Sequence, residues 1–410
     1  MDRVTHLAQQ SFFQLHKLII VGVTIVSATV SPARLLAFDT LRKVGRGGYA
    51  SDLLAAAGPL DPRDAALGSE IVLGVLRGQA QLDFLIQHYS GRAVAKLDFE
   101  VLLALRMGVY QLRYLDRVPP HAAVGQSVEL VKSMGFRSAT GFANAVLRKV
   151  GREAVAWPDR AVELSLPDWL LERWDREFGA ATATLIARAD LRPPETYIRI
   201  PPNREIPPGI TVEPTEIPGC YRLAAGEAGG FRIQDIGSQA VVPLLDLAPG
   251  LTFLDLCAAP GNKTAQALEF GVRAVACDFH AKRVEMLRPL GVRVVHLDGT
   301  RPLPFGRRFD RILLDAPCSG TGTLARNPEI KWRLQAADIH ELHRRQVVLL
   351  RNALDVLAPG GVLVYSTCSL EREENDGVIE TLGLSPRGIM RRIPGLQPGD
   401  GFFAAVIRSM

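Results

Sequence analysis

The chain has 410 residues, of which 47% are hydrophobic and 22% charged, a composition typical of a globular protein with two or three domains. Its net charge is +5, and residues 1–150 carry 17 Lys and Arg against 11 Asp and Glu, which indicates either a module that attracts polyphosphate or a solvated helical surface. The five cysteines are odd in number and form no C-x-x-C pair, which argues against a disulfide scaffold or a zinc site and favours reduced thiols in the cytoplasm.

The first apolar run, LIIVGVTIVSATV at residues 18–30, is too short to span a bilayer comfortably. With Lys17 before it, the run weakly resembles the core of a signal peptide, although nothing downstream is typical of a secreted protein. We interpret residues 1–31 as an extension of unknown role and expect no membrane partner.

Residues 32–151 have the apolar periodicity of helices. Val124, Val128 and Val131 recur at i, i+4 and i+7, and residues 97–115 provide a second long apolar face. We therefore expect an all-α domain here.

A change of composition follows over residues 152–230. The segment begins with a helical pattern around Trp169 and Trp174, and proline then becomes frequent. Two short β-prone runs, TYIRI and GCYRL, lie among the prolines. The pattern predicts a small α+β connector.

From residue 231 to residue 410, short buried-type strands alternate with helical segments. The expected strands are residues 253–256, 273–277, 292–296, 311–314 and 361–365. This alternation predicts a doubly wound, Rossmann-like α/β domain, in which ligands bind beyond the carboxyl ends of the strands.

The expected cofactor loop follows the first of these strands. It reads CAAPGNK and consists of Cys257, Ala258, Ala259, Pro260, Gly261, Asn262 and Lys263. A glycine turn between strand and helix lets a ligand approach the backbone closely, although a tight turn without a ligand has the same pattern. The loop is neither a Walker loop nor G-x-G-x-x-G, so no diphosphate cradle is expected.

Three aspartates follow successive strands on the same edge of the sheet. Asp278 is placed to accept hydrogen bonds from ribose hydroxyls, Asp298 could reach an adenine edge, and Asp315 ends the fourth strand. A nucleoside without a pyrophosphate, such as S-adenosyl-L-methionine, fits this set of residues.

Two of the cysteines also lie just past strand ends, in DAPCSG and YSTCS. Cys318 and Cys368 are flanked there by Pro, Ser, Thr and Gly, whereas Cys220 and Cys277 have the surroundings of buried apolar residues. A thiolate beside a methyl donor suits the alkylation of pyrimidine carbon 5. Its addition at C6 makes an enamine that attacks the methyl group, and an acid near N3, for which Asp315 is placed, assists the addition.

At these residues the chain resembles a known family, the RsmB (Sun/Fmu-type) RNA cytosine-5 methyltransferases. The similar stretches are FRIQDIGSQA, LDLCAAPGNKT, LLDAPCSGTGTLARNPEIKW, YSTCSLEREEN and DGFFAA. The segments VPPHAAVGQSVELVK and GFANAVLRKV resemble the NusB RNA-binding helical domain. The resemblance extends over nearly the whole chain from Pro32 onward, and the pairing of domains implies a bacterial 16S rRNA substrate.

The resemblance also implies roles for individual residues. Cys368 would be the nucleophile and Cys318 would assist proton removal or product release, whereas DNA cytosine methyltransferases use the cysteine of the PC motif as the nucleophile. The CAAPGNK loop, with Asp278, Asp298 and Asp315, would bind the cofactor, and Lys263 would lie near the methyl donor. The family usually has Gly where this chain has Asn262, which places cofactor affinity in question, although Asn tolerates positive φ better than most residues.

A group of basic and aromatic residues follows the PC motif and could hold RNA phosphates and stack an extruded base. Its members are Arg326, Asn327, Lys331, Trp332 and Arg333. A solvated loop anchored by Trp332 explains the same residues.

The expected partner is RNA, with small-subunit rRNA preferred, and the expected protein is a cytoplasmic monomer that needs no metal. Two other functions stay open on the residues alone. One is a tRNA cytosine-5 methyltransferase, and the other is a non-catalytic RNA-binding scaffold.

Overall fold

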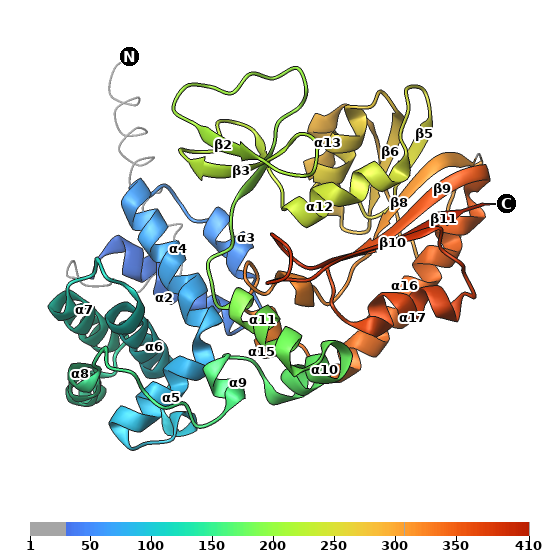
Figure 1. The fold of residues 1–410 in the computed structure, drawn as a ribbon. Coiled ribbons are helices and arrows are strands. Elements are labelled where there is room, and N and C mark those ends of the chain that lie inside the picture. Colours follow the sequence, from blue (N-terminus) through green and yellow to red (C-terminus); the bar gives the residue numbers. More distant parts are fainter. Residues whose placement is uncertain (1–29, 307, 410) are drawn as a thin grey trace, which may run out of the picture. The chain divides into compact units, whose positions relative to one another are not determined.

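The computed structural model of the chain describes residues 30–306 and 308–409 (Figure 1). All but the last two residues of the expected extension, residues 1–31, lie outside this part. Among the described residues, no helix combines the length and the apolar character needed to cross a membrane.

Contacts divide the chain into two compact units. Of the described residues, the first takes in those up to Gly48, Asp52–Val75 and Leu82–Val155, and the second takes in Tyr49–Ser51, Leu76–Gln81 and those from Ala156 onward. The expected α/β domain and all but the first four residues of the expected connector therefore fall within one unit, while the boundaries at residues 151 and 230 stay predictions.

The N-terminal third is helical, as expected. Its helices are α2 (Pro32–Val44), α3 (Ala50–Ala55), α4 (Pro62–Arg77), α5 (Gln79–Ser90), α6 (Phe99–Tyr114), α7 (Pro120–Ser133) and α8 (Thr140–Lys149). Helix α6 packs closely on α7 and α8 at Gly108, where an added Cβ would lie 2.7 Å from the side chain of Leu147.

The buried face of α7 differs from the expected one. It consists of Ala123, Ser127, Leu130 and Val131, so the expected stripe through Val124 and Val128 is wrong by about one position. Side chains on a helix lean toward its N-terminus, which shifts the covered surface relative to the Cα positions.

The second unit begins with three helices and a small sheet. The helices are α9 (Arg160–Glu163), α10 (Asp168–Phe178) and α11 (Ala180–Asp190), and the strands are β1 (Tyr197–Arg199), β2 (Thr211–Pro214), β3 (Cys220–Ala225) and β4 (Arg232–Ile233). The strand order is β2-β3-β1-β4, with all pairs antiparallel. This confirms the α+β character expected of the connector.

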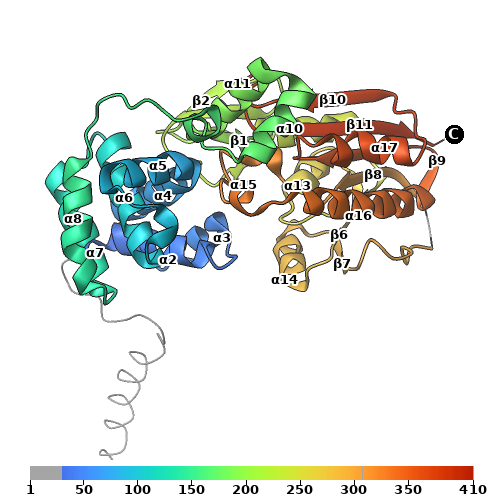
Figure 2. The same ribbon diagram turned by 90° about the horizontal axis from the view of Figure 1, so that it is seen from below.

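A seven-stranded sheet follows, in the order β10-β11-β9-β8-β5-β6-β7. Its strands are β5 (Thr252–Asp255), β6 (Arg273–Asp278), β7 (Arg293–His296), β8 (Phe309–Asp315), β9 (Leu357–Thr367), β10 (Gly388–Arg392) and β11 (Phe402–Arg408). The five expected strands correspond to β5 to β9 and are parallel, whereas β10 and β11 were not expected and are antiparallel. In Figure 2, β10 and β11 lie toward one edge of this sheet and β6 and β7 toward the other.

Helices cover both faces of this sheet (Figure 1). They are α12 (Ile236–Val241), α13 (Asn262–Leu268), α14 (Ala281–Val284), α16 (Ala336–Asp355) and α17 (Asp376–Thr381). Helix α15 (Ile330–Arg333) lies beside α11 instead (Figure 1), and its Ile330 packs against the core of α10 and α11. Successive strand residues point to opposite faces. Leu254 and Leu314 therefore join the core beneath α16 and α17, while Phe253 and Leu313 join the core beneath α12 and α13.

Candidate active site

The site is built where the chain order of the parallel strands reverses. Strand β5 lies between β8 and β6, so the connections leave β5 in opposite directions across the sheet. Open α/β sheets bind ligands at such a point, beyond the carboxyl ends of the strands. The loop after β5 begins at Leu256, and the loop after β8 carries Cys318, so the expected cofactor loop and one thiol meet there.

The cofactor loop turns at Gly261, which has φ +102° and caps α13. At this φ a side chain would be strained whatever the space around it, and an added Cβ would also lie 2.9 Å from Leu290 and 3.0 Å from Leu287. Asn262 is the first residue of the helix and does not have positive φ. The expectation that Asn262 must tolerate positive φ is therefore wrong, because Gly261 takes that conformation. The Asn262 amide instead donates to the Ile233 carbonyl at 3.3 Å.

The aspartates at the strand ends are fixed by local hydrogen bonds. Asp278 is the last residue of β6, and its carboxylate accepts from the backbone N–H of Ala259 at 3.3 Å and of His280 at 2.9 Å. Asp298 lies two residues beyond β7 and accepts from both the backbone and the hydroxyl of Thr300. These two hydrogen bonds lower the pKa of Asp298, which keeps its carboxylate charged.

Lys263 and Asp315 form an ion pair across the switch point. The Lys263 Nζ lies 2.7 Å from Asp315 Oδ2, and the Ser366 hydroxyl donates to Asp315 Oδ1 at 2.8 Å. Burial disfavours the ammonium, but the adjacent carboxylate outweighs burial and raises the pKa of Lys263. Both oxygens of Asp315 are therefore oriented, one by the cofactor loop and the other by β9.

The two candidate thiols lie side by side. Cys368 directly follows β9 and Cys318 lies three residues beyond β8, and their Sγ atoms are 3.4 Å apart. Both side chains keep partial exposure. The Cys368 carbonyl accepts a hydrogen bond from the backbone N–H of Gly322 at 2.9 Å. A Cβ added to Gly322 would lie only 2.8 Å from the same carbonyl oxygen.

The cysteines differ in how tightly they hold their protons. The hydrogen bond to Cys368, reinforced by burial, raises the pKa of Cys318 well above its usual value. Burial raises the pKa of Cys257 in the cofactor loop, and that of Cys220 to about 11. Cys318 is therefore a thiol at neutral pH, and Cys277 and Cys220 are buried as expected.

Four polar residues of this site were missed from the sequence. They are Asp255, Thr264, Ser366 and Glu374. The Thr264 hydroxyl donates to Asp255 Oδ2 at 2.6 Å, and Oδ1 has no hydrogen-bond partner among the described residues. Polar residues inside otherwise apolar strand ends are the signal that could have identified Asp255 and Ser366.

The residues after the PC motif behave differently from the RNA-contacting group that was expected. Lys331 is 1% exposed, and its ammonium donates to the Arg77 carbonyl at 2.8 Å. The Trp332 indole donates to the Leu76 carbonyl at 2.7 Å. The expectation that Lys331 holds phosphate is wrong because its charge is buried, and Trp332 is an anchor. Arg333 keeps partial exposure.

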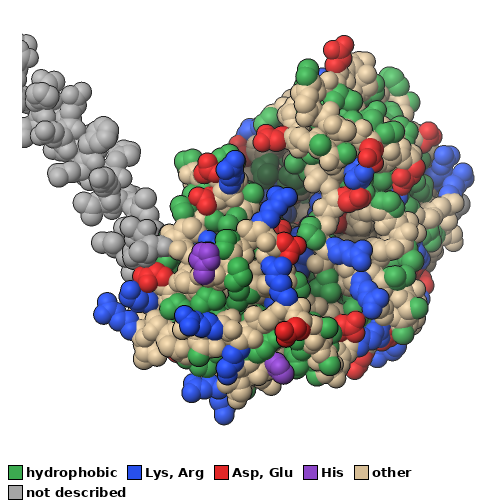
Figure 3. Space-filling model, turned by 60° about the vertical axis from the view of Figure 1, so that its left-hand side comes forward, with side chains coloured by type: hydrophobic (Ala, Val, Ile, Leu, Met, Phe, Trp, Pro, Cys, Tyr) green, Lys and Arg blue, Asp and Glu red, His purple; other side chains and the backbone are tan. Residues whose placement is uncertain are grey.

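The other two members of that group also have protein partners. Arg326 lies 2.8 Å from Asp400 and 3.0 Å from Asp235. The Asn327 amide donates to the Thr323 hydroxyl at 3.1 Å. Arg326 therefore links loops of the second unit. On the face shown in Figure 3, Lys and Arg side chains are interspersed with Asp and Glu, so charge alone does not mark an RNA path.

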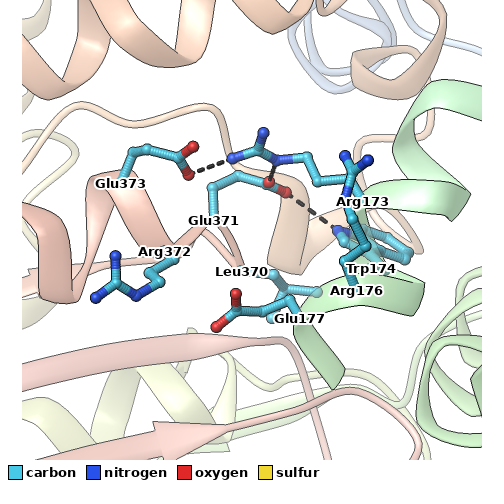
Figure 4. A pocket seen from close by; sticks show the side chains of 8 residues that line it. All are labelled: Arg173, Trp174, Arg176, Glu177, Leu370, Glu371, Arg372 and Glu373. Carbon is cyan, nitrogen blue, oxygen red and sulfur yellow. Dashed lines mark hydrogen bonds and ion pairs between the residues drawn. The ribbon is translucent and has the colours of Figure 1, made fainter. Parts of the chain in front are cut away.

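Helix α10 holds the segment that follows Cys368 (Figure 4). Arg173 pairs with both Glu371 and Glu373, and the Trp174 indole donates to Glu371 at 3.1 Å. These residues line a cavity of about 310 Å³. Glu371 is 2% exposed, and these two partners donate to its buried carboxylate.

The acidic rim suits S-adenosyl-L-methionine, which carries a sulfonium, an ammonium and two ribose hydroxyls. Asp278 keeps acceptor capacity beyond its two backbone bonds. Asp255 has one unpartnered buried oxygen at the start of the loop. Within the part of the chain that the structure describes, no cluster of three or more potential metal ligands is found. The fold and this rim define a methyltransferase with two adjacent thiols.

Comparison with known proteins assigns the family. Residues 242–394 match the family model described as 16S rRNA methyltransferase RsmB/F, and residues 31–152 match the NusB family. A probable ribosomal RNA small subunit methyltransferase B of Bacillus subtilis is 31% identical over 84% of this chain and 87% of that protein. The ribosomal RNA small subunit methyltransferase B of Sodalis glossinidius is 34% identical over 85% of this chain and 90% of that protein.

Solved structures show the same fold. The crystal structure of PH0851 has a TM-score of 0.75 at 23% identity and covers 92% of this chain and 99% of that one. A methyltransferase homolog from Pyrococcus horikoshii has a TM-score of 0.53 at 27% identity, over 61% of this chain and 97% of that one. The chain belongs to the RsmB/F family of RNA methyltransferases, with a NusB domain, and its cofactor is S-adenosyl-L-methionine.

Proposed function

We propose that the chain methylates carbon 5 of a cytosine in 16S rRNA, through a covalent bond between Cys368 and C6 of the base. The observation that carries this proposal is the 3.4 Å separation of the Cys318 and Cys368 sulfurs at the switch point. Addition and later elimination at C6 require one thiolate beside the base and a methyl donor, and a second thiol in contact with the first can assist the release. The names of the relatives support rRNA as the substrate.

Cys368 is the attacking residue in this proposal. Its sulfur lies close enough to Lys263 to raise the pKa of that ammonium, so a thiolate there faces a cation. When bound, S-adenosyl-L-methionine supplies the methyl group. Asp315, oriented by Lys263 and Ser366, is placed to hold a proton at N3 while the sulfur adds to C6.

Cys318 acts at the end of the reaction. After methyl transfer a solvent molecule takes the C5 proton, because Cys318 holds its own proton tightly. The C5–H electron pair then forms the double bond between C5 and C6. As the bond from C6 to the Cys368 sulfur breaks, the electron pair returns to that sulfur. The Cys318 S–H can then donate a hydrogen bond to the departing thiolate, which favours release of the methylated RNA.

The test uses two variants of the full chain with small-subunit rRNA and labelled cofactor. Cys368→Ser is expected to abolish methyl transfer while cofactor binding is retained. Cys318→Ala is expected to accumulate a covalent enzyme–RNA adduct that survives denaturing gels, because release is slowed. Adduct formation by Cys368→Ser, or none by Cys318→Ala, would contradict the assigned roles.

The substrate is tested separately by bisulfite sequencing of total RNA from a strain that lacks the gene. Loss of one methylated cytosine in 16S rRNA is the expected result. Loss from a tRNA would replace the proposed substrate, and unchanged RNA together with tight RNA binding would favour a scaffold.

A further inference from the structure

The spacing of the two sulfurs cannot be set by either loop alone. Cys318 follows β8 and Cys368 follows β9, so fifty residues of chain separate them. Strand pairing fixes the two strands as far as Asp315 and Ser366, and the thiols lie beyond that point. The loops contact each other directly, since Gly322 N–H donates to the Cys368 carbonyl at 2.9 Å and the Ser319 and Ser369 hydroxyls lie 3.0 Å apart. A group that binds the neighbours of both cysteines would fix the spacing of the sulfurs further.

Glu374 makes this connection through both of its carboxylate oxygens. Its Oε1 accepts from the backbone N–H of Ser319 at 2.8 Å and from the Gln346 amide at 2.9 Å. Its Oε2 accepts from the hydroxyls of Ser369, at 2.5 Å, and of Ser319. Ser319 and Ser369 directly follow Cys318 and Cys368, so one carboxylate binds the neighbour of each sulfur.

The groups around Glu374 are braced in turn. The Gln346 amide, from α16, also donates to the Pro317 carbonyl at 2.9 Å, one residue before Cys318. The Tyr365 hydroxyl, from β9, donates to the Glu374 backbone carbonyl at 2.6 Å. The connection therefore runs from α16 and β9 through Glu374 to both loops.

The carboxylate is held by neutral donors in a dry site. Glu374 is 0% exposed, and the hydroxyl, amide and backbone donors satisfy both oxygens. Burial raises the pKa of Glu374, and hydrogen bonds from Ser319 and Ser369 oppose that rise. A neutral side chain with one acceptor oxygen could not accept all four hydrogen bonds in this arrangement.

We propose that Glu374 is a positioning residue of the methyl transfer, which sets the distance between the Cys318 and Cys368 sulfurs by tying Ser319 to Ser369. The proposal rests on the two-thiol function above. It does not require Glu374 to touch RNA or cofactor.

The test measures the spacing without any RNA. In the full chain, diamide takes two electrons and two protons from a pair of adjacent thiols and leaves a disulfide. The rate at which Cys318 and Cys368 become linked is followed by peptide mass spectrometry. Glu374→Ala is expected to slow this linkage about tenfold or more, since displacements near 1 Å at reacting groups cost up to about a hundredfold.

Two further variants show how the rate of disulfide linkage depends on the side chain at position 374 and on loss of a carboxylate elsewhere. Glu374→Gln keeps one acceptor oxygen and offers an amide to hydroxyls that can rotate, so it is expected to restore most of the rate. Glu380→Gln is the matched control, because Glu380 is an exposed carboxylate on α17 that pairs with Arg372. It is expected to link at the native rate.

Affinity for S-adenosyl-L-homocysteine reports whether the variants are folded. If Glu374→Ala binds normally and links at the native rate, the proposal is overturned. If Glu374→Ala does not fold, Gln346→Met gives the decision, since it removes the brace to Pro317. Slower linkage in that variant supports the proposal, and the native rate overturns it. If the native chain does not methylate RNA, the proposed function is wrong. The comparison of linkage rates between the native chain and the variants still tests the role of Glu374.

Discussion

Asp255, the last residue of β5, offers a quantitative test of the electrostatics at the cofactor rim. Burial raises the pKa of its carboxyl to about 7 from a usual 3.8, and the hydrogen bond from Thr264 opposes only part of the rise. Because the folded pKa lies above the unfolded one, the folded state binds this proton more tightly. The stabilisation is complete below about pH 4 and is lost as the pH rises through about 7.

Asp255→Asn removes this titration. The free energy of unfolding of the native chain, relative to the variant, should fall by about 1.4 kcal/mol per pH unit between about pH 5 and about pH 7. Over that window the fall is about 3 kcal/mol. Urea unfolding followed by tryptophan fluorescence measures it, since all four tryptophans lie in the second unit.

Asp310→Asn is the control with the opposite sign. Hydrogen bonds from the backbone and hydroxyl of Thr252 lower the pKa of Asp310, so its contribution to stability is lost as the pH falls. The native advantage over this variant should grow with pH. A difference between the native chain and Asp255→Asn that stays flat over the same window would refute the reasoning about Asp255.

Three other substitutions test separate parts of the site. Arg173→Met leaves the buried Glu371 without its guanidinium partner. The free energy of unfolding should therefore fall by about 3 kcal/mol in the same urea assay. An unchanged unfolding midpoint would contradict the pairing. Asn262→Gly should leave S-adenosyl-L-homocysteine affinity unchanged in calorimetry, because Gly261 already supplies the positive φ; a tighter complex would argue against this. Lys263→Met should lower kcat about a hundredfold, because Asp315 loses its cation, and native turnover would be inconsistent with that role.

The sequence predicted the parts of the fold that depend on local pattern. The strands β5 to β9 are buried apolar runs, and burial of both faces is what makes such runs recognisable. Strand β10 was not predicted because it is an edge strand, is mostly exposed and contains Arg391 and Arg392. Its pairing with β11 depends on contacts that no periodicity records.

The residues of the candidate site also differ in whether local sequence pattern could predict their positions. The strand-end positions of Asp278, Asp315 and Cys368 follow from motif and topology together, so they could be expected. The burial of Lys331 and the tie through Glu374 could not, because each depends on chain segments far away in the sequence. A lysine in a basic loop has the same local pattern whether its ammonium is solvated or capped by a distant carbonyl.

The two sulfurs, although neighbours, do not have equivalent surroundings. Glu374 is among the groups that raise the pKa of Cys318, whereas Cys368 is among those that raise the pKa of Lys263. Glu374 therefore contributes to the raised pKa of Cys318, and Lys263 lies near enough to Cys368 for their charges to interact. The hydrogen bond to Cys368 and burial are the larger causes of the raised pKa of Cys318, and the Glu374 carboxylate that ties the loops together adds to them. In the proposed mechanism this difference assigns addition to Cys368 and assistance of release to Cys318.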